Sequence, residues 1–236
     1  MKALASSDFV LRMQDKQARM KTHQWVYQLL RTNLLCGRIG PGHALTIRGL
    51  AEMLDVSPMP IREALHRLAC EGAVEVKDNR RVIVPTMTIE KFNELCQLRI
   101  LLETHAAVSA LPHIKEDEIS QLQQLDEQID IAVENGEVEN IGLINQSFHR
   151  TLYEVNPFQK SVALIESLWL QLGPFSRIVL SKLEKAYLVD RHVEALDALR
   201  RNDDEGLRIA IESDIRDGIA SIKSIDEFQT YFEGVA

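Results

Sequence analysis

Residues 46–71, TIRGLAEMLDVSPMPIREALHRLACE, decide the fold of this chain, because they predict two short helices joined by a tight turn. In the first helix Leu50, Met53 and Leu54 share one inward face, since residues three and four apart lie on the same side of a helix. Asp55 begins the turn. The stretch therefore predicts a helix-turn-helix, a motif that places its second helix in the major groove of DNA.

The second helix of this motif has a defined start. Ser57 stands where an N-cap belongs, with a hydroxyl that can satisfy an orphan amide, and Pro58 takes the first helical position, where a missing N–H costs nothing. The inward face of the helix is apolar: Ile61, Leu65 and Leu68. The outward face holds candidate DNA contacts, of which Arg62 is the strongest: Ser57, Met59, Arg62 and His66.

The charge of the chain is divided between its two parts. Residues 1–85 carry 13 Lys and Arg against 8 Asp and Glu, whereas the remaining residues carry 14 against 27. The whole-chain pI of about 5.4 taken alone argues against nucleic-acid binding. The part that contains the helix-turn-helix is nevertheless basic, which is the distribution that a DNA-binding domain with an acidic partner domain needs.

A further helix is expected before the motif. Apolar residues recur at helical spacing between Trp25 and Leu34, and Gly37 ends this helix in the manner of a C-terminal glycine. Residues 1–18 are polar and irregular by comparison, and we expect them to form a flexible N-terminal extension. The DNA-binding domain is therefore expected to span residues 19–85.

A small hairpin is expected after the motif. Two β-branched stretches, residues 74–76 and 82–84, are separated by the polar sequence KDNRR. The tip carries Arg80 and Arg81, which we count as candidate DNA contacts because of the basic context, the alternative being a solvated turn. The order helix, helix, helix, hairpin is that of a winged helix-turn-helix.

The chain is predicted to be helical after a short linker at residues 86–88. Thr88 can cap the first of these helices, and no alternating strand pattern follows it. The expected helices cover residues 89–111, 115–134, 138–154, 158–180, with a kink at Gly173-Pro174, 185–201 and 204–225. The fold class is therefore mainly α: an N-terminal winged helix-turn-helix domain is followed by an antiparallel all-helical bundle at residues 89–230, expected to bind an effector and to dimerise.

Four polar side chains fall on helix faces that should be buried: Arg99, His149, His192 and Asp214. A single buried histidine is usually a satisfied core residue. Several such groups from different helices can instead converge, and imidazole nitrogens with a carboxylate are ligands that divalent transition metals select. A metal site and a metal-free polar pocket, in which Asp214 pairs with a histidine, are both consistent with this pattern.

Other features indicate a soluble protein inside the cell. The three cysteines, Cys36, Cys70 and Cys96, have no metal-ligand spacing and fall on or near apolar helix faces, so we expect reduced, packed thiols. No apolar run approaches the roughly 18 residues that a membrane span requires, and the first residues lack a signal-peptide core. We therefore expect a cytoplasmic protein with no membrane partner.

The chain resembles GntR-family transcription regulators of the FadR type, which join a winged N-terminal domain to an all-helical FCD ligand-binding domain. The most specific stretch is residues 37–76, GRIGPGHALTIRGLAEMLDVSPMPIREALHRLACEGAVEV. In the second half, three segments follow in the order expected of that helical domain: LRILLETHAA at 98–107, NQSFHRTLYEVNP at 145–157 and RHVEALDALRRND at 191–203. The resemblance covers nearly all of the chain after residue 20.

The resemblance implies DNA contacts at Arg48 and Arg62, which match arginines that commonly bind DNA in this family. Pro58 stands where the family often has an arginine, so one of the family's contacts is missing here. The wing usually includes a glycine at its tip, whereas this chain has Asn79-Arg80-Arg81. Guanidinium groups at that tip can still reach the minor groove or the phosphates.

The resemblance also implies a metal site, made in this family by an Asp or Asn four residues before a His, that His, and two further histidines. The matching positions are Asn145, His149, His192 and Asp214. Such a set can hold zinc, nickel or manganese, with lower affinity than a three-histidine set. A carboxylate effector is implied at Arg99, for which the alternative is an ion pair with Glu103 or Glu166.

We therefore predict an effector-responsive transcriptional regulator and not an enzyme: a dimeric repressor on a two-fold DNA operator, released by a small carboxylate. One alternative is a helical metalloenzyme with an attached DNA-binding head, which would have only Glu103 and Glu166 as further inward acidic groups. The other is a bare dimerisation bundle without ligand. Thermal stabilisation by a metal or a small carboxylate would exclude that second alternative.

Overall fold

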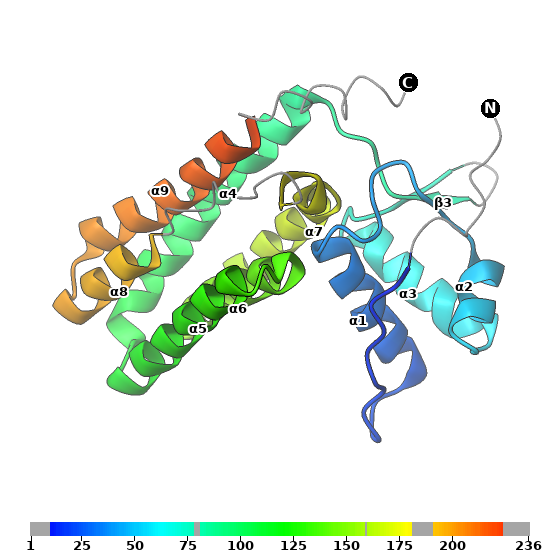
Figure 1. The fold of residues 1–236 in the computed structure, drawn as a ribbon, viewed down its shortest axis with the longest axis horizontal. Helices are drawn as coiled ribbons and strands as arrows, with labels where there is room; N and C mark the ends of the chain where they lie inside the picture. The colour runs from blue at the N-terminus through cyan, green and yellow to red at the C-terminus, as the bar shows by residue number, and fades with distance from the viewer. Residues whose placement is uncertain (1–9, 78–80, 159, 181–190, 224–236) are drawn as a thin grey trace. The chain divides into compact units, whose positions relative to one another are not determined.

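The computed structural model describes residues 10–77, 81–158, 160–180 and 191–223 (Figure 1). Contacts within the chain divide it into two compact units. The first unit extends to Met87 and also includes Trp169–Arg177, and the second includes Thr88–Leu168 and the chain from Ile178. The division after Met87 falls inside the expected linker. The sequence did not indicate that the middle of a later helix would group with the first unit.

Three helices form the body of the first unit: α1 (Thr22–Leu35), α2 (Ile47–Met53) and α3 (Pro58–Cys70). Helix α1 lies against α3, and the inward residues predicted for α3 are buried: Ile61, Leu65 and Leu68. The predicted start of α3 at Pro58 is confirmed, although the Ser57 hydroxyl makes no capping hydrogen bond. The inward position expected for Met53 is wrong, because this last residue of a short helix has a 40% exposed side chain.

Two turns of the first unit use left-handed backbone. Gly37 has a φ of 68° directly after the last turn of α1, as its predicted role at the end of that helix requires. Asp55 has a φ of 50° in the turn between α2 and α3. Aspartate tolerates this conformation better than most residues, because its short polar side chain can hydrogen-bond locally. The tight turn of the motif is therefore formed without a glycine.

The wing is a three-stranded antiparallel sheet in the order β1-β3-β2: β1 (Ala44–Leu45), β2 (Glu75–Val76) and β3 (Val82–Ile83). Glu75 pairs with Ile83, so the predicted hairpin is present. Strand β1 was not expected, since two residues are too few to show an alternating pattern. Arg80 lies outside the described residues, and Arg81 is exposed directly before β3.

The segment before α1 is docked on that helix. The Arg12 N–H donates to Oδ1 of Asn33 at 2.7 Å, and Nδ2 of Asn33 donates to the Arg12 carbonyl at 3.1 Å. The indole N–H of Trp25 donates to the Gln14 carbonyl at 2.8 Å. The described part of the extension expected at residues 1–18 therefore has hydrogen-bond partners on α1. Asn33 is completely buried, so its amide requires partners, and the Arg12 main chain provides two of them beside the Leu29 carbonyl of α1.

Helix α7 (Lys160–Leu180) contributes its middle segment to the first unit. Gly173 approaches the main chain at the end of α1 so closely that a Cβ atom there would lie 2.7 Å from the Leu34 carbonyl oxygen and 2.7 Å from Cα of Leu35. Only glycine permits this backbone approach. The helix continues through Pro174.

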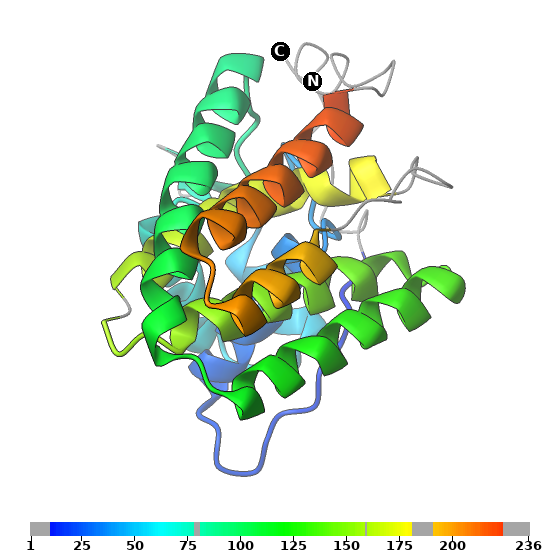
Figure 2. The same cartoon turned by 90° about the vertical axis from the view of Figure 1, so that its left-hand side faces the viewer.

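Five helices of the second unit close into a ring: α4 (Ile89–Ala110), α5 (Glu116–Glu134), α6 (Val138–Glu154), α8 (His192–Arg201) and α9 (Asp204–Lys223). Around the ring, α4 contacts α6, α6 contacts α5, α5 contacts α8, α8 contacts α9, and α9 contacts α4 (Figure 2). A 3-10 turn, η1 (Leu111–His113), follows α4. Thr88 caps α4 as predicted, since its hydroxyl accepts from the Lys91 N–H at 3.3 Å.

The predicted fold class is confirmed, with two local corrections. The helix expected at residues 185–201 begins at His192, with Arg191 as its non-helical N-cap; residues 181–190 lie outside the described part. Cys36 and Cys96 are buried as expected. Cys70 is exposed, because it is the last residue of α3 and lies beyond the apolar face of that helix.

Candidate functional site

The outward face of α3 carries the residues predicted to contact DNA. Because the apolar residues of α3 are packed inward, the side chains of Ser57, Met59, Arg62 and His66 are exposed together. Arg48 is exposed in the first turn of α2, where the Thr46 hydroxyl caps the helix by accepting from the Gly49 N–H at 3.1 Å. A guanidinium can bind phosphate or form a bidentate pair with guanine. This face therefore has the exposure and the chemistry of a DNA-reading surface.

Contacts along the flank of α3 fix its orientation on α1. The Arg67 guanidinium lies 3.7 Å above the ring of Tyr27, and the Tyr27 hydroxyl donates to the Glu71 carboxylate at 2.9 Å. Burial and the hydrogen bond to Glu71 raise the pKa of Tyr27 to about 12. Nearer the start of both helices, His23 Nδ1 lies 3.3 Å from Glu63. Because Arg67 is engaged by Tyr27 and Glu71, we do not count it with Arg62 among the candidate DNA contacts.

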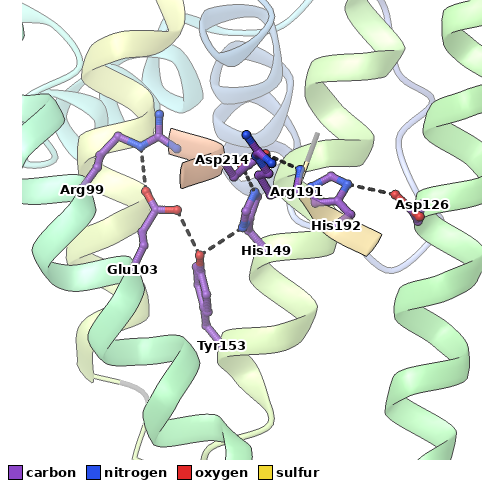
Figure 3. Close-up of polar contacts among 8 residues, drawn as sticks. All are labelled: Arg99, Glu103, Asp126, His149, Tyr153, Arg191, His192 and Asp214. Atoms are coloured by element: carbon purple, nitrogen blue, oxygen red, sulfur yellow. Dashed lines mark hydrogen bonds and ion pairs between the residues drawn. The ribbon is translucent and has the colours of Figure 1, made fainter. Parts of the chain in front are cut away.

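The helical ring of the second unit gathers a polar cluster, with at least one member from each of its five helices. Figure 3 shows these side chains and the contacts that join them. The members are Arg99 and Glu103 on α4, Asp126 on α5, His149 and Tyr153 on α6, His192 with its N-cap Arg191 on α8, and Asp214 on α9. The ring therefore brings together three of the four predicted metal ligands and the predicted effector residue in one unit.

Three of the predicted metal ligands converge. His149, His192 and Asp214 each offer one ligand atom, and these atoms all lie within 4.8 Å of one another. Nε2 of His149 is 3.1 Å from Oδ2 of Asp214. The histidines are almost fully buried, and the Asp214 side chain is 10% exposed. The fourth predicted ligand, Asn145, is half-buried one turn before His149 on the same helix.

Two partners of the histidines in the cluster were missed by the sequence prediction. Asp126 accepts a hydrogen bond from Nδ1 of His192 at 3.0 Å. The Tyr153 hydroxyl lies 3.1 Å from Nδ1 of His149. Both had a periodicity signal: Asp126 lies four residues after buried Leu122, and Tyr153 lies four residues after His149.

Within the part of the chain that the structure describes, Arg99, the predicted effector-binding residue, uses only the Nε atom of its guanidinium in an ion pair. Nε of Arg99 donates to Oε1 of Glu103 at 2.6 Å, so the ion pair considered as an alternative is present. Glu166 pairs instead with Arg150 at 3.1 Å. Among the described residues, the terminal nitrogens of Arg99 make no hydrogen bond, and its side chain is 23% exposed. Burial acts to lower the pKa of Arg99, but the interactions with the Glu103 carboxylate outweigh it, and the net effect is a raised pKa. The guanidinium therefore stays charged.

The environment of Asp214 favours the charged form of its carboxylate. Burial alone would raise the pKa of Asp214, but its hydrogen bond with His149, the nearby imidazoles and the Arg191 N–H lower it to about 2. Burial, followed by the Glu103 charge, raises the pKa of Tyr153 well above its usual value, so its hydroxyl keeps its proton. That proton is donated to Oε2 of Glu103 at 3.1 Å. A chain of contacts therefore runs from Arg99 through Glu103, Tyr153 and His149 to Asp214.

No described helix combines the length and the apolar character needed to cross a membrane.

Comparison with known proteins matches each unit to a family. Residues 22–84 match the model for bacterial regulatory proteins of the gntR family, and residues 94–217 match the FCD domain. The HTH-type transcriptional regulator McbR of Escherichia coli K12 is 30% identical over 195 residues, covering 81% of this chain and 88% of McbR. The solved McbR structure has a TM-score of 0.80 at 28% identity and covers 85% of this chain and 96% of that one.

Two further relatives are transcriptional repressors by name. RspR of Escherichia coli K12 is 23% identical and covers 86% of this chain and 90% of its own length. The gluconate operon transcriptional repressor of Bacillus subtilis is 25% identical and covers 74% of each chain. Together with the exposed face of α3, these matches show that the chain belongs to the GntR family of bacterial transcriptional regulators, with an FCD domain as its helical second part.

Proposed function

We propose that this protein is a FadR-type repressor: as a homodimer it binds a two-fold DNA operator, and a small carboxylate bound in the helical domain releases it. The observation that carries the proposal is the convergence of two imidazoles, a carboxylate and a guanidinium paired through its Nε inside one helical ring. The names of two relatives support the sign of regulation, since both are called transcriptional repressors. Its partner is chromosomal DNA, so we place its action in the cytoplasm.

The residues of the cluster fit a divalent transition metal. His149 and His192 would supply imidazole nitrogens and Asp214 a carboxylate oxygen, a set that zinc, nickel and manganese accept. The three ligand atoms all lie within 4.8 Å of one another. Asn145 is the candidate for a fourth ligand. When bound, the metal would supply a positive charge for an anionic effector.

Arg99 is proposed to bind the carboxylate of the effector. Its Nε is held by Glu103, which fixes the plane of the guanidinium and leaves the terminal nitrogens for a ligand. A guanidinium binds a carboxylate through two parallel hydrogen bonds, so it recognises a planar anion better than a lysine would. Because Arg99 and His149 belong to one chain of contacts, an effector could engage the guanidinium and the metal together.

The winged domain is proposed to bind one operator half-site. Arg62 would read a base edge and Arg48 would contact phosphate, with the remaining contacts from Ser57, Met59, His66, Arg80 and Arg81. A two-fold dimer would place two such helices about 34 Å apart, one turn of B-DNA. The effector would release the operator only by binding better to the state of the dimer that does not fit these half-sites.

An electrophoretic shift with the DNA upstream of the protein's own gene tests the proposal. We expect a shift at low salt that weakens when zinc and sodium gluconate are added, gluconate being a hydroxy-carboxylate probe suggested by the name of one relative. Unrelated DNA of the same length is the control, because nonspecific binding comes from the phosphates alone. A complete absence of binding to upstream fragments at low salt would contradict the proposal.

The burial of the polar cluster disfavours the reading of the helical domain as a bare dimerisation bundle. Glu103 and His192 are completely buried, and each is held by further polar side chains, Glu103 by Arg99 and His192 by Asp126. Buried clusters of ionisable groups of this kind are typical of functional sites. Thermal unfolding with zinc alone distinguishes a ligand-binding domain from a bare dimerisation bundle, since a bundle without a ligand site would show no rise in melting temperature.

A further inference from the structure

We infer that Asp126 and Tyr153 are positioning residues of the helical domain, each holding one histidine so that its Nε2 faces the centre of the site. The inference rests on the metal site proposed above and adds two residues that would not touch the metal. Both act through the opposite ring nitrogen, Nδ1. Neither belongs to the ligand set that the sequence pattern predicts.

Asp126 fixes the tautomer and the direction of His192. A carboxylate can only accept, so the 3.0 Å contact with Oδ1 of Asp126 requires the proton of His192 to be on Nδ1. Nε2 is then the nitrogen offered to a metal. The ring plane is fixed as well, because Phe148 stacks on His192 with centroids 4.0 Å apart and planes inclined by 24°. Both side chains of the pair are nearly removed from solvent, at 1% and 13% exposed.

Tyr153 does the same for His149. The hydroxyl has one proton, which it donates to Glu103, so it accepts from His149 and the Nδ1 of that ring carries the hydrogen. Nε2 of His149 consequently points to Asp214. Glu103 is itself held by Arg99 at 2.6 Å, which fixes the acceptor of the tyrosine proton.

These contacts have a predictable effect on metal binding. A ring whose direction is already fixed loses less conformational freedom when it binds a metal, and an acceptor at Nδ1 makes Nε2 a stronger donor. Asp126 offers His192 a carboxylate oxygen, which is a stronger acceptor than the hydroxyl that Tyr153 offers His149, so Asp126 should contribute more to affinity. Outer partners of this kind change metal affinity by about 10- to 100-fold.

The test compares Asp126→Asn with Asp130→Asn in the full-length protein. Asp130 lies one turn further along α5 and is exposed, so its substitution makes the same charge change away from the site. Zinc affinity is measured by competition with a chromophoric chelator. We expect Asp126→Asn to bind zinc about 10-fold more weakly or worse, and Asp130→Asn to match the wild type.

A second readout separates positioning from a merely structural role. In the zinc-loaded wild type, nitrogen-15 NMR of the imidazoles should show both histidines protonated at Nδ1 and bound through Nε2. Asp126→Asn should move the Nδ1–H resonance of His192 and leave that of His149 in place, whereas Tyr153→Phe should do the reverse. These ring signals report the tautomers even where a variant is less stable.

The outcomes are distinct. If wild-type protein binds zinc through Nε2 of both rings and Asp126→Asn binds it equally well, the positioning role is wrong and the metal site stands. If a histidine of the loaded wild type is metal-bound through Nδ1, the positioning role is likewise overturned. If the wild type does not bind zinc, nickel or manganese, the proposed metal site and the inference that rests on it both fail.

Discussion

Nε2 of His149 lies 3.1 Å from Oδ2 of Asp214, and this contact joins α6 to α9 inside the helical ring. Nδ1 of the same ring faces the Tyr153 hydroxyl at 3.1 Å, so the imidazole is held between Tyr153 and Asp214. A metal at the proposed site would be held by Nε2 of His149 and the carboxylate of Asp214. The same two atoms therefore stabilise the metal-free fold and define the proposed ligand set.

The pairing of Asp214 makes the stability of the metal-free protein depend on pH. Its pKa is about 2 in the folded chain against an ordinary value of 3.8, so its contribution is fully present above pH 4 and is lost as pH falls towards 2. That shift corresponds to about 2 kcal/mol. Asp214→Asn should remove this part of the acid dependence, which urea unfolding at pH 5 and at pH 2.5 would measure. Asp130→Asn is the control, and an equal loss of stability between the two pH values in wild type and Asp214→Asn would contradict the assignment.

Substitution of Arg99 should abolish the effector response and leave operator binding intact. Arg99→Ala also strands the completely buried Glu103 carboxylate, and leaving a buried charge unpaired costs about 3–5 kcal/mol. Arg99→Lys is therefore the sharper variant, since it keeps a cation beside Glu103 but cannot form a bidentate pair. The measurement is operator release by zinc and gluconate in a shift assay. Release equal to that of the wild type would exclude the role of Arg99.

Helix α3 carries two arginines that can be compared directly, Arg62 and Arg67. Arg62 is exposed on the outward face, whereas Arg67 stacks on Tyr27 and pairs with Glu71. Arg62→Ala should weaken operator binding by about 1–3 kcal/mol and relax the sequence preference at one base position. Arg67→Ala should lower thermal stability with a smaller effect on DNA affinity. Fluorescence anisotropy with operator and scrambled duplexes checks both, and equal losses of operator affinity for the two variants would argue against the assigned face.

Arg48 should behave as a phosphate contact. Arg48→Ala is expected to weaken binding to operator and unrelated DNA alike, because a phosphate carries no sequence information. Each lost phosphate contact reduces the slope of log affinity against log salt by about 1. Binding titrations at several salt concentrations measure that slope. A slope unchanged from the wild type would remove Arg48 from the interface.

Gly173 should tolerate no side chain. A Cβ atom at this position would lie 2.7 Å from backbone atoms of Leu34 and Leu35, which cannot rotate away as a side chain could. Gly173→Ala is therefore expected to destabilise the protein by about 1–3 kcal/mol. Gly136→Ala is an informative comparison, since nothing lies near that position and any cost there comes from its φ of 67° alone. Thermal unfolding that shows Gly173→Ala as stable as the wild type would rule out the close approach.

Local signals in the sequence were enough for the helical framework. Ser57 and Pro58 marked the start of α3, Thr88 marked the cap of α4, and Gly37 marked the end of α1, because caps depend on a few neighbouring residues. The same dependence on neighbouring residues explains why Met53 was wrongly predicted to be buried. Periodicity assigns a face to each residue of a helix, but it does not show where the neighbouring elements end.

The buried cluster was only partly predictable. His149, His192 and Asp214 were selected as polar residues on apolar faces, and the ring brings them together. The residues that hold them, Asp126 and Tyr153, depend on which helices become neighbours, and that is set by tertiary packing. Glu103 was considered only as an ion-pair partner, whereas in the structure it also accepts the Tyr153 proton.

The amide of Asn33 determines how far the chain can be shortened from its first residue. A protein trimmed to residue 19, where the expected DNA-binding domain begins, would deprive Asn33 of the Arg12 main chain and Trp25 of the Gln14 carbonyl. Each polar group that loses its partner in this way costs about 1–3 kcal/mol, a large part of the stability of a small domain. A shortened protein should therefore start no later than residue 10, and an affinity tag belongs ahead of that residue, with a spacer.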